Sequence, residues 1–260
     1  MSTTPEPEAA DEAGRLATSR LLRTLGPIED KRANAGYPIH PHSSLALDHQ
    51  RMPGLQVGHS VDRALHHSLD CLRGLDQLLK TTGPQHYAPY LLIRGALESA
   101  ATAVWLLDPD ERTTRLQRRV AIEVDNAKEA SKAIAAAGRS DDNDPESWAR
   151  GMSALLDSAG LTLKDCPWKG YGTIVRDIDD APKTVKSTEL AWRACSGMSH
   201  GKFWSFQMFA AESNRRDTGN GAIQADFKPS YHGLAIVLEV VVRTVHRADS
   251  LYDERRKAIL

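Results

Sequence analysis

The chain has 260 residues, with 33 Lys plus Arg against 34 Asp plus Glu, so its formal net charge is −1 and its pI is about 6.8. This balance argues against a globally basic nucleic-acid binder. Hydrophobic residues make up 41% and charged residues 26% of the chain, which excludes a disordered protein and is typical of a globular one with a substantial core.

Cysteine usage and the N-terminal residues indicate a cellular compartment. Cys71, Cys166 and Cys195 are odd in number and widely spaced, so they suggest neither a disulfide framework nor a cysteine zinc site. Glu8 and Asp11 lie where a secretory signal would carry positive charge followed by an apolar run. We therefore expect a cytoplasmic protein in a reducing environment.

The N-terminal third begins with poorly patterned sequence. Residues 1–35 are rich in Pro, Glu, Ala, Thr and Arg, and we expect a mobile tail that contains at most a short helix. Residues 36–58 contain three prolines and no sustained period, which predicts an irregular segment laid over the core. Residues 36–260 are expected to form a single domain.

Helical periodicity begins after this segment. Apolar residues at spacings of three and four predict an amphipathic helix over 59–80. Residues 87–107 are apolar nearly all round and long enough to span a bilayer. Arg94 and Glu98 lie near the middle of this stretch, which favours a core helix of a soluble protein and no membrane. A further helix is expected to run to about residue 137.

The C-terminal half contains an insertion and two more long helices. We expect a loop-rich insertion over 138–186, with an acidic loop at 138–146 and a short helix after it. Ser187 is a candidate N-cap for a helix that runs to about Glu212, and the last helix covers 231–257. The fold class is therefore all-α, and we expect an antiparallel bundle of about five long helices.

The sequence disfavours two catalytic motifs. Residues 197–201 read Gly-Met-Ser-His-Gly and match GxSxG, but that motif requires a strand before the serine and the preceding sequence is helical. No glutamate has a histidine three residues later, as a di-metal bundle would require. His59, Asp62 and His66 share one side of a helix, which is too few ligands for a metal site. We expect no metal and no cofactor.

One set of polar residues could form a site between two helices. Arg193 and His200 are seven residues apart, which places them at nearly the same azimuth of a helix two turns apart. Arg94 and Glu98 occupy adjacent turns of the core helix, and packing of the two helices could bring all four side chains into one interior. Arg94 and Glu98, together with the hydroxyls of Ser196 and Ser199, could then contribute to binding a substrate.

The segment from Arg193 to His200 resembles the Arg-x(4-6)-His motif of the HEPN superfamily. The members of this superfamily are small helical domains. Many HEPN proteins are metal-independent ribonucleases of toxin, antiphage and RNA-processing systems, and several act as dimers with a composite site. By this resemblance Arg193 would hold the scissile phosphate and His200 would assist 2′-hydroxyl attack or protonate the leaving group. Ala194 follows the arginine where many members have a polar residue. The sequences WRACSGMSHGKFW and LIRGALESA also resemble uncharacterised bacterial helical proteins.

Other interpretations of these residues stay open at this point. The four charged side chains could form a satisfied polar network that only fixes the register of the helices, or they could bind RNA or a nucleotide without cleaving it. The aromatic residues around 192–209 suit a core better than base stacking. A local basic cluster reads as a solvated helix face or as a contact to a phosphate backbone; it comprises Arg112, Arg115, Arg118 and Arg119.

Overall fold

The computed structural model describes residues 7–35, 38–139 and 145–258, and it is mostly helical, with 71% of residues in helices. The predicted helical class is therefore confirmed. The elements are α1 (Pro7–Arg23), α2 (Gly26–Ala35), α3 (Ser44–Arg51), α4 (Val57–Thr82), α5 (Ala88–Leu107), α6 (Arg112–Ala136), α7 (Pro145–Ala159), the 3₁₀ turn η1 (Leu163–Asp165), α8 (Tyr171–Asp177), α9 (Thr188–Ser199), α10 (Phe203–Phe209), β1 (Ala211–Asp217), β2 (Ile223–Lys228) and α11 (Tyr231–Arg255).

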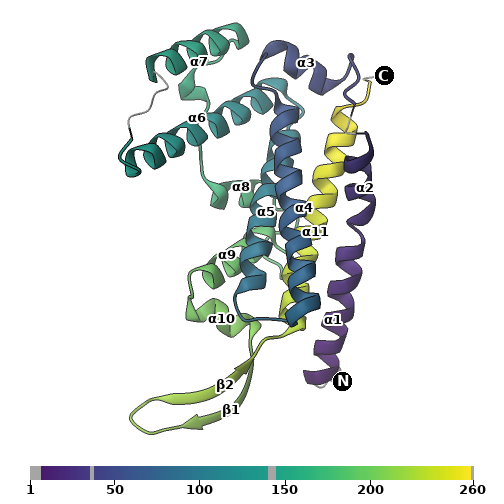
Figure 1. Cartoon of the computed structure of the whole chain (residues 1–260), viewed down its shortest axis with the longest axis vertical. Coiled ribbons are helices and arrows are strands. Elements are labelled where there is room, and N and C mark those ends of the chain that lie inside the picture. Colours follow the sequence, from purple (N-terminus) through teal and green to yellow (C-terminus); the bar gives the residue numbers. More distant parts are fainter. Residues whose placement is uncertain (1–6, 36–37, 140–144, 259–260) are drawn as a thin grey trace.

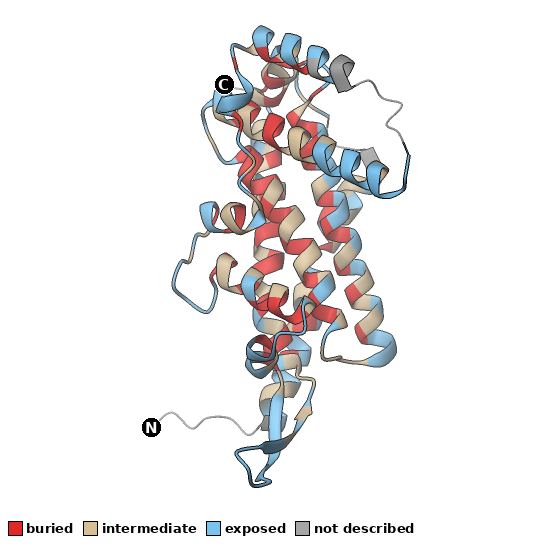
Figure 2. Cartoon of the chain, turned by 90° about the vertical axis from the view of Figure 1, so that its left-hand side faces the viewer, coloured by how far each residue is buried: buried red, intermediate tan, exposed pale blue. Residues whose placement is uncertain are grey.

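Helix α5 forms the centre of the molecule. It packs against α4 and α11, and α1 packs on the outer side of α11 (Figure 1). Ile93, Leu97 and Val104 are fully buried in these contacts, and the buried residues gather along the length of these helices (Figure 2). Helix α5 is long and apolar enough to cross a membrane, but 61% of its most apolar stretch is buried inside the fold. Its packing is that of a core helix.

Helix α6 departs from the expected bundle. It runs across the end of α4 and α5 instead of lying along them, and α7 lies beyond it (Figure 1). The long helices α1, α4, α5 and α11 lie side by side, while α6 forms a separate arm over one end of them. The sequence pattern defines a helix and its apolar face, but the crossing angle depends on the side chains that meet at each contact.

Residues 7–35 are helical and packed, where the sequence suggested a mobile tail. Thr18, Leu25 and Ile28 of this segment are buried. Gly14 brings α1 very close to α11, since a Cβ atom at Gly14 would lie 2.5 Å from the backbone nitrogen of His232. Small residues at such a contact carry little hydrophobic signal, and this explains why the composition of the segment did not predict its packing.

The two segments expected to be irregular also contain helices. Within 36–58, the Ser43 hydroxyl caps α3 by accepting a hydrogen bond from the Ala46 amide at 3.1 Å. Within 138–186 the structure contains α7, η1 and α8. The core of the expected acidic loop, residues 140–144, lies outside the described residues. Short helices of this kind have too few turns to show a clear period.

The helix expected from Ser187 to Glu212 is divided into α9 and α10 and is followed by a hairpin. The antiparallel strands β1 and β2 extend away from the helices (Figure 1). Gly219, Asn220 and Gly221 have positive φ and form the turn between them. Asn-Gly is a strong hairpin signal and the residues of β2 alternate between apolar and polar, but β1 is polar and exposed along its whole length and shows no such alternation.

Candidate functional site

Local interactions fix both ends of α9, the helix that carries Arg193 and His200. The Ser187 hydroxyl accepts a hydrogen bond from the Leu190 amide at 3.1 Å, which confirms the predicted N-cap. At the other end Gly201 has φ of 62°, and the Lys202 amide donates to the Gly197 carbonyl at 2.9 Å. This pattern is a Schellman motif, in which glycine adopts the left-handed conformation that ends a helix.

Close packing between α9 and α10 depends on Gly197. A Cβ atom at this position would lie 2.6 Å from the Ser205 hydroxyl oxygen and 2.9 Å from a ring carbon of Trp204. The sequence suggested that Gly197 and Gly201 together permit close approach of another backbone. The structure divides these roles, because Gly197 accommodates α10 whereas the position of a Cβ at Gly201 has open space around it.

Arg193 and His200 lie on the solvent-facing side of α9. The Arg193 side chain is 53% exposed and His200, at the C-cap, is also exposed. Nε and Nη2 of Arg193 donate to Oε1 of Glu189 at 3.0 and 2.7 Å, and Arg176 reaches the same oxygen. Hydrogen bonds from Arg193 and then Arg176 hold the pKa of Glu189 below its usual range. The expected placement of Arg193 and His200 in an apolar interior is wrong.

Exposed aromatic side chains follow His200 in the chain. Phe203 is 61% exposed and Trp204 is 48% exposed, although the sequence placed both in the core. Phe203 belongs to a group of rings that includes Phe206 and Phe227, with centroid separations of 5.0 to 6.5 Å. The end of α9 therefore presents an imidazole beside a partly exposed aromatic surface.

Arg94 and Glu98 form a second, separate group between α5 and α9. Arg94 Nε donates to Glu98 Oε1 at 2.9 Å, and the indole N–H of Trp192 donates to the same oxygen at 2.8 Å. Both charged side chains are half-buried or more. Within the described residues, no hydrogen bond or ion pair connects this group to Arg193 or His200.

The two serines of the predicted site differ in their surroundings. The Ser199 hydroxyl donates to the Cys195 carbonyl at 2.8 Å, one turn earlier in the same helix. Ser196 is half-buried on α9. Because Ser199 ends a helix and is preceded by no strand, the turn that an α/β-hydrolase serine requires is missing here. The GxSxG match is thus incidental.

Two arginines of α6, Arg115 and Arg119, are buried, although the sequence pattern suggested a solvated helix face. The guanidinium of Arg115 is almost fully buried and donates to both carboxylate oxygens of Asp48 at 2.8 Å. It also donates to the carbonyls of Pro109 and Asp110 and to the Ser44 hydroxyl. Five hydrogen bonds satisfy this guanidinium, so the interpretation of a solvated basic face is wrong for Arg115.

Other arginines of the same cluster have different surroundings. Arg112 is 45% exposed and reaches Asp48 at 3.3 Å. The Arg118 guanidinium lies 4.7 Å from the ring centroid of Trp105, and burial lowers its pKa. Arg119 is buried and donates to Glu123 one turn later in α6. The partners of Arg112 and Arg118 lie on α3 and α5, and no local pattern in the sequence could have identified those two.

The histidines of α4 do not converge on a metal site. Within the described residues, no group of three or more His, Cys, Asp or Glu side chains is arranged to hold a metal ion. His66 is exposed, and Asp62 is ion-paired with Arg32. The polar residues of α4 thus do not converge as the ligands of a metal site would have to.

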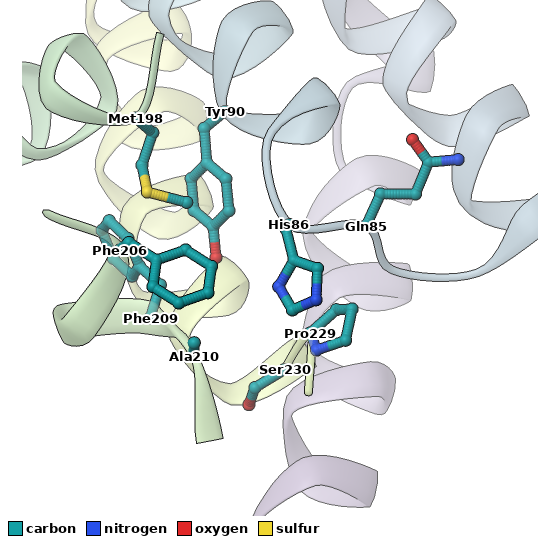
Figure 3. Close-up of a pocket in the computed structure, with 9 residues that line it drawn as sticks. All are labelled: Gln85, His86, Tyr90, Met198, Phe206, Phe209, Ala210, Pro229 and Ser230. Atoms are coloured by element: carbon teal, nitrogen blue, oxygen red, sulfur yellow. The ribbon is translucent and has the colours of Figure 1, made fainter. Parts of the chain in front are cut away.

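A crevice beside α10 lies next to the end of α9 (Figure 3). Tyr90, Met198, Phe206 and Phe209 line one side of it, and His86 lies opposite. The rings of Tyr90 and Phe209 stack with centroids 4.6 Å apart. The crevice has no room for a water-sized molecule, so it is a packing seam and not a binding site.

Comparisons with models of protein families, with curated proteins and with solved structures find no match for this chain. Its function must therefore be argued from its own residues.

Proposed function

We propose that this protein is a cytoplasmic, metal-independent ribonuclease of the HEPN type, with Arg193 and His200 as its catalytic residues. The observation that supports the proposal best is the exposure of both side chains on the same helix, next to the exposed rings of Phe203 and Trp204. Binding and cleavage of single-stranded RNA require a group that binds phosphate, a group that transfers protons and surfaces on which bases stack. The guanidinium, the imidazole and the aromatic rings can serve these three roles.

The chemistry follows from the two functional groups. Arg193 binds the scissile phosphate and gives up its ion pair with Glu189 to do so. This ion pair is at the surface and contributes little to stability, so its loss costs little free energy. An imidazole has two ring nitrogens that can accept or donate a proton, so His200 can accept a proton from the attacking 2′-hydroxyl or donate one to the leaving 5′-oxygen. The products are a 2′,3′-cyclic phosphate and a 5′-hydroxyl end.

The functional unit in this proposal is a homodimer. A single α9 face is open to solvent and offers one imidazole, whereas acid and base roles in one reaction are best served by two groups. The exposed apolar side chains Phe203 and Met208 give a second copy a surface on which to pack. Light scattering coupled to size exclusion tests the dimer independently of any activity.

The role of α5 in the proposal is to support the site. Trp192 precedes Arg193 in the chain and is held by Glu98, which is itself held by Arg94. This half-buried group positions α9 and does not itself contact RNA. Ser196 and Ser199 remain candidates for contacts to the sugar or phosphate.

Cleavage of single-stranded RNA of mixed sequence in EDTA tests the proposal. We expect wild type to release 2′,3′-cyclic phosphate ends, and His200→Ala to reduce the rate by about a hundredfold or more because proton transfer is lost. Arg193→Ala is expected to weaken both binding and cleavage. His66→Ala and Arg139→Ala remove an exposed imidazole and an exposed guanidinium elsewhere and should cleave at the wild-type rate.

The two open alternatives give different results in the same assay. Binding of RNA that is lost in Arg193→Ala, with no cleavage by wild type, identifies a non-catalytic RNA-binding module. Absence of both binding and cleavage, together with unfolding of Arg94→Ala, identifies the polar groups as a purely structural network.

A further inference from the structure

Arg119 of α6 is a buried cation whose hydrogen-bonding capacity is only partly used. Its side chain is 6% exposed, and Nη2 donates to Glu123 Oε2 at 3.0 Å. Nε and Nη1 are buried and have no hydrogen-bond partner within the described part of the chain. Buried donors without acceptors cost free energy, and folded proteins rarely retain them without a reason.

The same side chain lines a cavity of about 410 Å³ between α6 and the start of α4. Gln56, His59 and Arg63 contribute from the α4 side, and Glu123 and Asn126 contribute from α6. The lining is mostly polar, in contrast to the crevice beside α10. Of the polar side chains in this lining, all but that of Glu123 can donate a hydrogen bond.

The charges around this cavity favour an anion. Burial lowers the pKa of Arg119, the hydrogen bond and charge of Glu123 oppose this, and the positive charge of the nearby Arg63 lowers the pKa further. Gln56 precedes α4, a helix of 26 residues, and its side chain makes no capping hydrogen bond, although His49 Nε2 accepts one from the Gly58 amide at 3.3 Å. Two guanidinium groups thus line the cavity with one carboxylate, and the positive end of the α4 dipole adds to their charge.

We propose that this cavity binds a phosphate group, either as inorganic phosphate or as the phosphate of a small phosphorylated molecule. A dianion with several acceptor oxygens matches two guanidinium groups, an imidazole and two side-chain amides better than a carboxylate does. On binding, the Arg119 guanidinium turns from Glu123 towards the cavity and its free donors gain acceptors. This site involves none of the residues of α9, so it does not depend on the proposed ribonuclease activity.

Titration calorimetry of the full chain with inorganic phosphate tests the site, with chloride held constant. We expect saturable binding with one phosphate per chain, and a loss of affinity of roughly tenfold or more in Arg63→Ala, since a charge-assisted hydrogen bond is removed. Arg63 is exposed, so this variant should fold normally. Glu123→Gln removes the competing carboxylate and should bind phosphate more tightly. Arg139→Ala, a surface arginine after the end of α6, is the matched control and should bind as wild type does.

Three results would overturn the inference. They are the absence of saturable phosphate binding, equal affinity in Arg63→Ala and wild type, and acetate binding as tight as phosphate binding. Titrations with inorganic phosphate and with a nucleoside monophosphate distinguish the two sources of the group, because only a phosphorylated molecule that fits the rest of the cavity would bind more tightly than the free ion. Arg119→Lys keeps the charge without the fork of donors and should bind phosphate more weakly than wild type while remaining folded.

Discussion

Arg115 and Asp48 are charged residues buried as deeply as the leucines around them. Taking two ions out of water is costly, and the cost is offset here by the two-pronged contact and by three further hydrogen bonds to the guanidinium. Removal of one partner would leave the other charge buried and unpaired. The pair therefore makes the positions of α3, α6 and the loop between α5 and α6 depend on one another.

Arg115→Met is expected to lower the free energy of unfolding by about 3–5 kcal/mol, because the Asp48 carboxylate stays buried without its partner. Denaturant unfolding measures the effect. The double variant Arg115→Met/Asp48→Leu should recover most of the loss, and Arg112→Ala, which removes the exposed partner of Asp48, should cost less than about 1 kcal/mol. An equal loss in the Arg112 and Arg115 variants would contradict the argument.

The sequence could not have identified this pair. Asp48 and Arg115 are 67 positions apart, and an apolar neighbour such as Leu116 does not show that the charged residue beside it is buried as well. A run of arginines on a helix is usually solvated, and the composition of α6 matches that expectation. Only the tertiary arrangement distinguishes Arg115 from Arg112 three residues earlier.

At the scale of elements, Asp179 stabilises the start of α9 from outside the helix. One carboxylate oxygen accepts hydrogen bonds from the Ser187 hydroxyl and the Glu189 amide, and the other accepts from the amides of Thr188 and Ala181. Burial opposes ionisation of Asp179, but these hydrogen bonds outweigh it and lower its pKa. The helix that carries the candidate site is thus tied to the loop after α8.

The lowered pKa of Asp179 predicts how stability depends on pH. Because the folded pKa lies below the unfolded value of about 3.9, the contribution of the carboxylate is complete above that value and is lost as the pH falls through the folded pKa. Asp179→Ala should cost about 1–2 kcal/mol at pH 7, and the difference from wild type should shrink as the pH is lowered below about 4. Urea unfolding at several pH values measures it.

Asp180→Ala is the matched control for this experiment. Asp180 is exposed and pairs with Arg243 at the surface, so its loss should cost less than about 1 kcal/mol at any pH. A difference between Asp179→Ala and wild type that stays constant down to pH 2 would refute the role of the ionised carboxylate.

Long helices were predictable from the sequence and their interruptions were less so. The helices expected over 59–80 and 87–107 are α4 and α5, and the N-cap at Ser187 is confirmed. Apolar residues continue on both sides of Gly201, so the period alone predicts one helix where there are two. The glycine itself was the available signal, because a left-handed residue is a common way to end a helix.

At the scale of the whole molecule, α1 holds the start of α11. The Asp11 carboxylate accepts hydrogen bonds from the Ser230 hydroxyl and from the amides of Tyr231 and His232. An acidic side chain at the positive end of a 25-residue helix is favourable. The first described helix of the chain and the last one are thereby joined at one end.

Gly14→Val is expected to separate α1 from α11, because the added side chain would overlap the backbone at His232. Hydrogen exchange should then become faster in residues 7–35 and at the start of α11, with α4 and α5 little changed. Gly26→Val is the matched control, since a Cβ there meets no neighbour. Unchanged exchange in α1 of the Gly14 variant would show that the helix does not depend on this contact.

The sequence suggested the residues of the candidate site, but it did not predict how they are arranged. Spacing predicted that Arg193 and His200 share one side of a helix, and both are exposed, but which side of α9 faces solvent depends on what packs against it. Trp192, Cys195 and Met198 occupy the inner face, and their neighbours lie on α5 and α10. Burial of a helix face is a property of the whole fold, and a local pattern with both polar and apolar residues on each side does not determine it.

The hairpin of β1 and β2 extends away from the helices. Its strands are mostly exposed, and near its base the ring of Phe227 packs against Phe203 and Phe206 of α10. Changes at its tip, around residues 218–222, are therefore expected to leave the helices unchanged. A protease could nick the chain there and leave the two fragments associated, and a short peptide tag inserted at the same point would leave the helices that carry the candidate site unaltered.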